Sequence, residues 1–284
     1  MTPAKSTSAG LARVTAGAVV PEQLLPYLSA VSPLRPRAVG SCVALMGAGL
    51  AVLVGYPTGA PDDRAALDAA VNGLLATQGL ARVTVLACAK PSAAPADAAT
   101  AEDAYWALPL PLPAPGQKLR NMLRRGARET VITSASGAAA WTAEHEALAE
   151  GFIASHELDE GSVHIFRRVR AYLAAAPQAL AFSARLGDGR LAACCVGDFS
   201  SLATAFYMFA FRAPFAPPGT ADALVAALAS EGTARGHSRL NLGLGISPGV
   251  AFFKKKWGAM PFLPYVETSW ELRKKGLFSR LFGR

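Results

Sequence analysis

Lys254 lies in the run Phe253-Lys-Lys-Lys-Trp-Gly258, where its residue type allows two kinds of chemistry. A lysine ammonium holds a carboxylate or a phosphate as a point charge, and it takes part in proton transfer only when its pKa falls. Tyr207, Asp198 and Glu267 are the other candidates for acid–base chemistry. Asp198 ends a predicted strand that we expect to face a cleft, and Glu267 lies on the last strand. The competing interpretations are surface carboxylates for the two acids and a core position for Tyr207.

The histidines and cysteines do not indicate metal chemistry. No pair of histidines has H-x-x-x-H spacing and no pair of cysteines has C-x-x-C spacing, so we expect no metal site. The four cysteines lie in apolar segments, which is typical of small core residues. The glycines between 243 and 249 miss the G-x-G-x-x-G spacing of a dinucleotide loop.

Composition limits the class of protein. The chain has 284 residues, of which 52% are hydrophobic and 17% charged, enough to build a substantial core and too apolar for a disordered chain. Four cysteines in this length exclude a disulfide scaffold. The net charge of +8 favours an anionic partner, which could be a phosphate-bearing cofactor, RNA or a lipid headgroup.

Basic residues cluster in three places, at 118–128, at 254–256 and at 273–284. The first two could line one groove for a phosphate-rich partner, although such runs are usually solvated faces. In the third, apolar side chains at 277, 278, 281 and 282 make a basic amphipathic tail that either packs on the body or touches an anionic membrane.

The first part of the chain contains a stretch without charge, residues 38–61, that is long enough to span a bilayer. The glycines at 47 and 49 separate two short β-rich runs, 41–46 and 50–55, and favour a buried hairpin over a spanning helix. A helix at 62–79 and a strand at 82–88 follow. Because residues 1–13 lack the pattern of a secretion signal, we expect a cytoplasmic protein, with membrane contact only at the periphery of the inner face.

An internal repeat is indicated by an offset of 157 positions, which aligns Pro57 with Pro214, Gly79 with Gly236 and Arg82 with Arg239. The alternative is a chance likeness of two alanine-rich helices. Prolines at 109–115 favour an edge position for a strand at 105–110, after a loop at 90–101. The remaining expected elements are helices at 117–129, 143–156 and 163–175, a hairpin of 180–186 with 191–196, a strand at 202–211, a helix at 220–231, a strand at 239–244, a helix at 249–257 and a strand at 265–272.

The segment from Leu224 to Ala259 resembles the centre of the GNAT acyltransferase fold, in which a helix, a glycine and a strand precede a helix bearing Phe-Tyr-x-x-x-Gly-Phe. Here that last motif is Phe253-Lys254-Lys-Lys-Trp-Gly258-Ala259, with lysine in place of tyrosine. This variant is similar to Fem-like aminoacyltransferases and to the C-terminal domain of phosphatidylglycerol lysyltransferases. The segment 119–125 also resembles the basic helix that opens the second half of those proteins.

The resemblance implies an α/β fold of two GNAT-like halves, each a mixed sheet flanked by helices. It implies a strand that splays from its neighbour beside the donor, which makes Phe211 and Arg212 candidate donor contacts. Gly219 and Thr220 would lie at the helix that meets the donor phosphates, and Asn241 on the next strand. Pro217 and Pro218 remove two N–H donors from that loop, which weakens the case for acyl-CoA and favours aminoacyl-tRNA.

The predicted organisation is an N-terminal segment with a short helix (1–37), a first half (38–115), a second half with the active site (116–272) and a tail (273–284). The predicted function is transfer of an acyl or aminoacyl group from acyl-CoA or aminoacyl-tRNA to an amine. The acceptor would be a small molecule, a lipid or a peptide, and no permanently bound cofactor is expected. The alternative is an inactive GNAT-like module that binds RNA or an anionic membrane.

Overall fold

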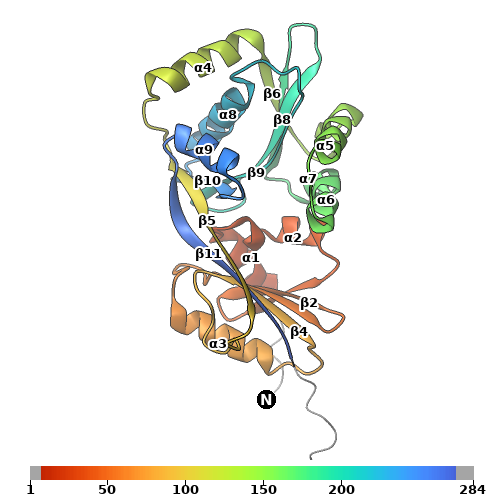
Figure 1. The fold of residues 1–284 in the computed structure, drawn as a ribbon, viewed down its shortest axis with the longest axis vertical. Helices are drawn as coiled ribbons and strands as arrows, with labels where there is room; N and C mark the ends of the chain where they lie inside the picture. Colours follow the sequence, from red (N-terminus) through yellow and green to blue (C-terminus); the bar gives the residue numbers. More distant parts are fainter. Residues whose placement is uncertain (1–7, 273–284) are drawn as a thin grey trace, which may run out of the picture.

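A single mixed sheet of eleven strands runs through the computed structural model, which describes residues 8–272. The strand order is β1-β2-β3-β4-β11-β5-β10-β9-β8-β7-β6. Figure 1 shows an elongated molecule with the first half at one end, the second half at the other, and two long strands, β5 and β11, running between them. The predicted tail at 273–284 lies outside the described residues.

The first half consists of β1 (Arg35–Val39), β2 (Cys42–Gly47), β3 (Leu50–Gly55), α3 (Arg64–Leu75) and β4 (Arg82–Ala87). The uncharged stretch forms the β2–β3 hairpin, as predicted, and its turn contains Ala48 and Gly49 with positive φ angles. Helix α3 then crosses back so that β4 pairs parallel to β3. No helix between residues 8 and 272 has both the length and the apolar character needed to cross a bilayer.

The second half repeats this order in a larger form. Strand β4 shifted by 157 positions coincides with β10, and α3 shifted in the same way falls inside α8. The elements are α4 (Gln117–Glu129), β6 (Val131–Ser136), α5 (Ala143–Ser155), α6 (Glu160–Arg167), α7 (Val169–Ala175), β7 (Ala179–Arg185), β8 (Leu191–Asp198), β9 (Thr204–Arg212), α8 (Thr220–Ala234), β10 (Arg239–Leu244) and α9 (Pro248–Lys256). The single helix predicted at 163–175 is two helices that meet at Arg168.

The two halves exchange their last strands. Strand β5 (Ala99–Pro109) is the last strand of the first half but pairs with β10 of the second, and β11 (Met260–Glu271) is the last strand of the second half but pairs with β4 of the first. The predicted edge position of the strand at 105–110 is therefore wrong, because β5 lies between β10 and β11. Its prolines from Pro111 onwards follow the strand, and its start reaches back into the predicted loop at 90–101.

Residues ahead of the first strand connect the halves. They form α1 (Ser8–Ala16), the 3₁₀ turn η1 (Pro21–Gln23) and α2 (Leu25–Val31), which lie in the middle of the molecule in Figure 1. The Gln23 amide donates to the carbonyl of Tyr56 in the first half at 2.7 Å. The Ser201 hydroxyl of the second half donates to the carbonyl of Ala18 at 2.8 Å.

Two apolar layers cover the sheet of the second half. Helix α8 buries Leu224 and Leu228 on one face, against Ala193 and Cys195 of β8. Helices α5 and α7 lie on the other face, where Tyr172 packs near Cys194. Side chains of a strand alternate between faces, so the adjacent cysteines of β8 enter different layers. Strand β9 is thus held between these two apolar layers, in the middle of the second half.

Candidate active site

Strands β9 and β10 separate after a short parallel pairing. Their register runs only from Thr204 with Arg239 to Phe206 with Asn241, although β9 continues to Arg212. A β-bulge follows at once, since Gly197 of β8 pairs with Tyr207 and Val196 pairs with Phe209, which leaves Met208 without a partner. A bulge bends its strand and increases the local twist. The backbone of β9 beyond Phe206 therefore has no strand beside it on the β10 side.

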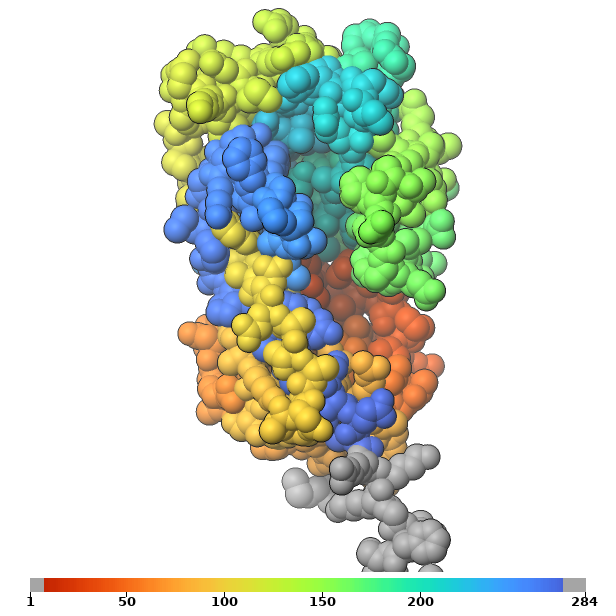
Figure 2. Space-filling model, in the orientation of Figure 1, coloured from red at the N-terminus to blue at the C-terminus, as the bar shows by residue number. Residues whose placement is uncertain are grey.

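A cavity of about 430 Å³ occupies the opening between the two strands. Its walls are β9, the end of β10, α6, α9 and the first turn of α8; the lining includes Phe166, Tyr207, Met208, Ala221, Leu242, Gly243, Phe253 and Lys254. Figure 2 shows the surface hollowed between α9 (blue) and the α6 region (green). We refer to this space as the β9–β10 cleft.

The N-terminus of α8 points its first turn at this cleft. Gly219 is the N-cap residue, with φ +93°, and no side chain caps the helix. Ala221 of the first turn lines the cleft. The positive end of a helix with uncapped amides attracts anions. Thr220 is fully buried and its hydroxyl donates to the carbonyl of Pro217 at 2.8 Å, so this predicted donor contact serves the loop itself.

Helix α4 supports the start of α8 from behind. A side chain at Gly219 would overlap the carbonyl oxygen of Met122, and one at Gly126 would overlap the carbonyl of Gly219. The basic residues of α4 face solvent, and its Leu119 and Leu123 line a separate cavity of about 460 Å³ together with Lys255 and Lys256. Lysines of the second basic cluster thus line this groove, while α4 contributes leucines and none of the cations of the first cluster.

Lys254 is buried in the wall of the cleft. Its ammonium donates to the carbonyl oxygens of Gly243, at 2.8 Å, and of Leu244, and so holds the end of β10. Burial lowers the pKa of Lys254 from 10.5 to about 8, while the charge of Asp103 acts in the opposite direction. An ammonium has three donors, so one N–H remains beyond the two carbonyl contacts.

Tyr207 lies on the strand at the entrance to the bulge and lines the cleft. Within residues 8–272 its hydroxyl has no hydrogen-bond partner. Burial raises the pKa of Tyr207 well above 10, and the charge of Asp222 adds to the effect. The phenol is therefore a hydrogen-bond donor at neutral pH and not a base.

A smaller space continues from the cleft along the end of β9. It has a volume of about 250 Å³, shares Tyr207, Ala210 and Ala221 with the cleft, and adds Phe211 and Arg212. Phe211 is only 2% exposed and packs among aromatic rings, so its side chain belongs to the core. Arg212 is exposed and donates to the carbonyl of Ala216 at 2.6 Å, which places it at the loop before α8.

Three predicted site residues lie elsewhere. Asp198 is fully buried on the α7 side of the sheet, where it accepts a hydrogen bond from the Tyr172 hydroxyl at 2.5 Å. We expected it to face the cleft, but it is not among the residues that line the cleft. Glu267 accepts from the Tyr265 hydroxyl at 2.7 Å on the central strand β11. Asn241 is fully buried and its amide donates to the carbonyl of Val19 at 2.8 Å, which joins β10 to the N-terminal segment.

Two carboxylates that we did not predict shape the cleft. Asp103 of β5 accepts from the backbone N–H groups of Gly245, at 3.1 Å, and Ile246, at 2.9 Å, and so holds the loop that follows β10. Asp222 in the first turn of α8 accepts from the Trp257 indole at 3.0 Å and pairs with Lys256 at 2.5 Å. No local pattern in the sequence indicates this link, because α8 and α9 are brought together only by the fold.

No family model matches the sequence, and no curated protein matches it. Solved structures match it over almost the whole chain. L-PGS from Bacillus licheniformis is 14% identical with a TM-score of 0.59, covering 95% of this chain and 92% of its own. The C-terminal domain of a putative lysylphosphatidylglycerol synthetase from Agrobacterium fabrum is 16% identical with a TM-score of 0.62, covering 92% and 91%.

FemX is 10% identical with a TM-score of 0.61, covering 93% of this chain and 95% of its own. A tandem GNAT protein from the clavulanic acid biosynthesis pathway also matches, at 13% identity and a TM-score of 0.50, covering 94% and 95%. The chain therefore has the fold of these proteins, a tandem GNAT fold, as its 224–259 segment predicted. At these identities the likeness concerns the fold.

Proposed function

We propose that the protein transfers an acyl or aminoacyl group from an activated donor to an amine, and that the reaction takes place in the β9–β10 cleft. The observation that carries this proposal is the separation of β9 from β10 beside an uncapped helix N-terminus. Unpaired strand backbone can hold an extended donor arm by main-chain hydrogen bonds, as an added strand would be held. The end of α8 can hold the donor's phosphates.

The chemistry needs alignment and charge stabilisation more than a nucleophile on the protein. An amine nitrogen attacks the donor carbonyl, the new C–N bond forms, and the thioester C–S or ester C–O bond breaks. The oxyanion that develops on the carbonyl requires donors in a site with little water. Tyr207 and Lys254 both line the cleft, and the hydroxyl of the one and the remaining N–H of the other are suited to this task.

The activated donor is either an acyl-CoA or a charged tRNA, and the two would contact different areas of the protein surface. A charged tRNA would need a phosphate-binding face beyond the cleft, which the exposed cations of α4 supply. Acyl-CoA needs only the cleft and the start of α8. A double variant, Lys118→Glu with Arg124→Glu, should weaken tRNA binding in a gel shift. The shift in melting temperature that acetyl-CoA produces should be the same in the variant as in the wild-type protein.

The test is transfer by the purified protein from acetyl-CoA, longer acyl-CoAs and aminoacyl-tRNAs to a panel of amines, beside thermal-shift measurements with each donor. We expect one donor class to raise the melting temperature and to be consumed. If no donor is consumed and none changes the melting temperature, the proposal is wrong. Binding of tRNA without transfer would instead support the alternative, a GNAT-like module that docks on RNA.

A further inference from the structure

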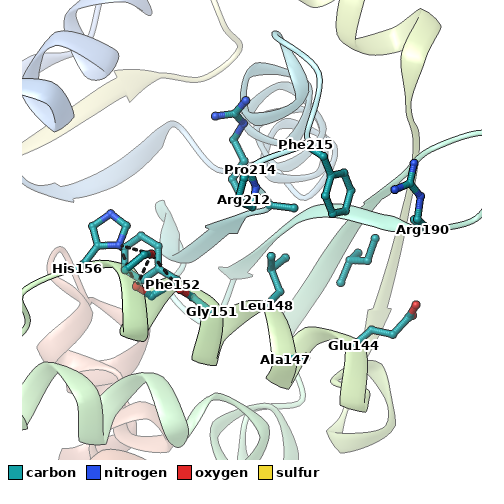
Figure 3. Close-up of a pocket in the computed structure, with 13 residues that line it drawn as sticks. Glu144, Ala147, Leu148, Gly151, Phe152, His156, Arg190, Arg212, Pro214 and Phe215 are labelled. Atoms are coloured by element: carbon teal, nitrogen blue, oxygen red, sulfur yellow. Dashed lines mark hydrogen bonds between the residues drawn. The ribbon is translucent and has the colours of Figure 1, made fainter.

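A cavity of about 490 Å³ lies beside the β9–β10 cleft, between α5 and the loop that leads into α8. Its floor is apolar, formed by Leu148 and Phe152 of α5 and by Leu191, Pro214 and Phe215 opposite. In Figure 3, Leu148 and Phe215 point towards one another across the space. Phe215 is 51% exposed, which leaves part of its ring accessible to a ligand in the cavity.

The charges on the rim of this cavity already have partners within the described chain. Arg190 donates to Asp188 at 2.8 Å and lies over the ring of Phe215 at 4.8 Å. Glu144 accepts from Arg185 at 2.6 Å. The free recognition surface is therefore the apolar floor, which fits a hydrocarbon or aromatic body better than a polar one.

The cavity leads back to the cleft through the 250 Å³ space at the end of β9. It shares Phe152, His156 and Arg212 with that space, which in turn shares Tyr207, Ala210 and Ala221 with the cleft. A ligand whose body fills the cavity between α5 and the loop can thus extend one end past His156 towards the donor. His156 lies where the 490 Å³ cavity meets the 250 Å³ space.

The imidazole of His156 has a defined tautomer. Its Nδ1 lies 2.9 Å from the carbonyl oxygen of Phe152, and a carbonyl only accepts, so Nδ1 carries the proton. The ring also stacks on Phe152 with centroids 3.9 Å apart. Among the described residues nothing hydrogen-bonds to Nε2, so its lone pair is free there, and Figure 3 shows that nitrogen turned away from α5. A histidine oriented by one ring N–H is arranged as a general base.

The other titratable groups around the route are unsuited to accept a proton. Tyr207 is held in its protonated form by burial, and Lys254 uses two N–H groups on backbone carbonyls. Arg190 and Arg212 are always charged. Glu144 is paired with Arg185, and burial raises the pKa of Cys194 to about 12. Asp198 and Glu267 lie outside the cavities described above.

We propose that the cavity between α5 and the β9–α8 loop is the acceptor site, that it takes a primary amine with an apolar body, and that His156 accepts the proton of the attacking amine. This inference rests on the proposed acyl transfer. The neutral amine nitrogen bonds to the donor carbonyl carbon as its N–H proton passes to Nε2. The C–S or C–O bond then breaks, and the imidazolium returns that proton to the departing thiolate or alkoxide.

The test uses phenethylamine as the acceptor and ethanolamine as a polar control. Gly151 faces the cavity, and a side chain built there meets nothing within 4 Å, so Gly151→Phe fills the space without entering the core. We expect the KM for phenethylamine to rise at least about tenfold in this variant, with the KM for ethanolamine unchanged. An unchanged KM for phenethylamine would overturn the assignment of the site.

The role of His156 is tested by His156→Ala, with His164→Ala on exposed α6 as the matched control. General-base catalysis contributes about 10²-fold or more, so kcat should fall by at least that factor in His156→Ala and recover in part on addition of imidazole. His164→Ala should keep the wild-type rate. Full activity in His156→Ala, or a loss that imidazole does not restore, would contradict the role as base.

Failure of the proposed function gives a different result. If the wild-type protein consumes no donor, calorimetric titration with phenethylamine still tests the cavity, because binding should be present in wild type and lost in Gly151→Phe. Absence of phenethylamine binding to the wild-type protein would refute the acceptor site on its own. Turnover of a donor with amines whose KM ignores Gly151→Phe would leave the transferase standing and remove the site.

Discussion

The two halves contain the same strand–helix–strand unit, but its two parallel strands stay paired in the first half and separate in the second. In the first half β3 and β4 stay paired from Leu50 with Arg82 to Gly55 with Ala87. In the second, β9 and β10 separate after Phe206. The difference begins with one residue, since β3 pairs with β2 without interruption and β9 carries the bulge at Met208.

The N-termini of the two equivalent helices, α3 and α8, also differ, the first being closed and the second open. The N-terminus of α3 is closed by Asp63, whose carboxylate accepts from the N–H of Ala66 at 3.0 Å. The space above it is filled, because a side chain at Gly55 would come within 2.5 Å of Leu67. Helix α8 begins at Gly219 with no side-chain cap and with cavities beside Ala221. In the second half, a bulge in β9 and the lack of a side-chain cap on α8 open the candidate site. In the first half, unbroken strand pairing and the Asp63 cap keep the same unit closed.

Gly219→Ala should have the largest effect on stability. A side chain at Gly219 combines a left-handed backbone, φ +93°, with an overlap on the Met122 carbonyl, so the free energy of unfolding should fall by about 3 kcal/mol. Gly59→Ala, in the loop before α3, has the same backbone problem at φ +90° but open space around it. It should cost only about 1 kcal/mol in urea unfolding. Equal losses would show that α4 does not press on the start of α8.

Lys254→Met removes the ammonium from the cleft and keeps much of its volume. The transfer rate should fall about 10²-fold, equivalent to about 2.7 kcal/mol of transition-state stabilisation. Thermal shift by the donor should persist, because the β9 edge and the start of α8 remain. The first half supplies the control, Arg64→Met on the exposed face of α3, which should leave kcat unchanged. A wild-type rate in Lys254→Met would contradict a role in the reaction.

The same lysine should give the protein a distinct dependence on pH. Burial lowers its pKa in the folded state from 10.5 to about 8. Between these values the unfolded chain binds a proton that the folded chain lacks, so stability from this group rises as pH increases through that window. The free energy of unfolding of wild type relative to Lys254→Met should increase by about 2 kcal/mol from about pH 8 to about pH 10. A difference that stays constant would mean that Lys254 titrates normally.

Asp63→Ala should have the smallest effect. Loss of an N-cap costs about 1 kcal/mol of stability, and the exposed start of α3 gives little more. Because Gly55 and Leu67 still fill the neighbouring space, the variant should not bind a second donor molecule. Donor stoichiometry by titration checks this, and a second binding event would show that the cap alone closes the first half.

Local patterns predicted much of this architecture. Glycine and proline punctuation indicated the repeat, and the Phe-Lys-Lys-Lys-Trp-Gly motif indicated the fold and singled out Lys254. For Tyr207 the sequence left core and cleft open, and the structure places it with Lys254 in the lining of the β9–β10 cleft. Pairings between distant segments were beyond such patterns. The strand at 99–109 looked like an edge because of its prolines, yet β10 and β11, more than a hundred residues away, enclose it.

The site was predicted less completely than the fold. Asp198, Asn241 and Glu267 carry the right chemical groups, but strand alternation and the N-terminal segment direct them into hydrogen bonds away from the cleft. His156 was noted only for its lack of metal spacing, because its tautomer depends on a carbonyl four residues away on the same helix. A bulge of one residue, which decides where side chains point, leaves no mark in composition.

The exchange of β5 and β11 bears on how such a chain could have arisen. A polypeptide of half this length would end in a strand that its own sheet does not accept, so two copies would have to trade strands to be complete. Joining the copies end to end turns that concentration-dependent assembly into a property of one molecule. Once fused, the copies no longer had to be identical, and one was free to open a site while the other stayed closed.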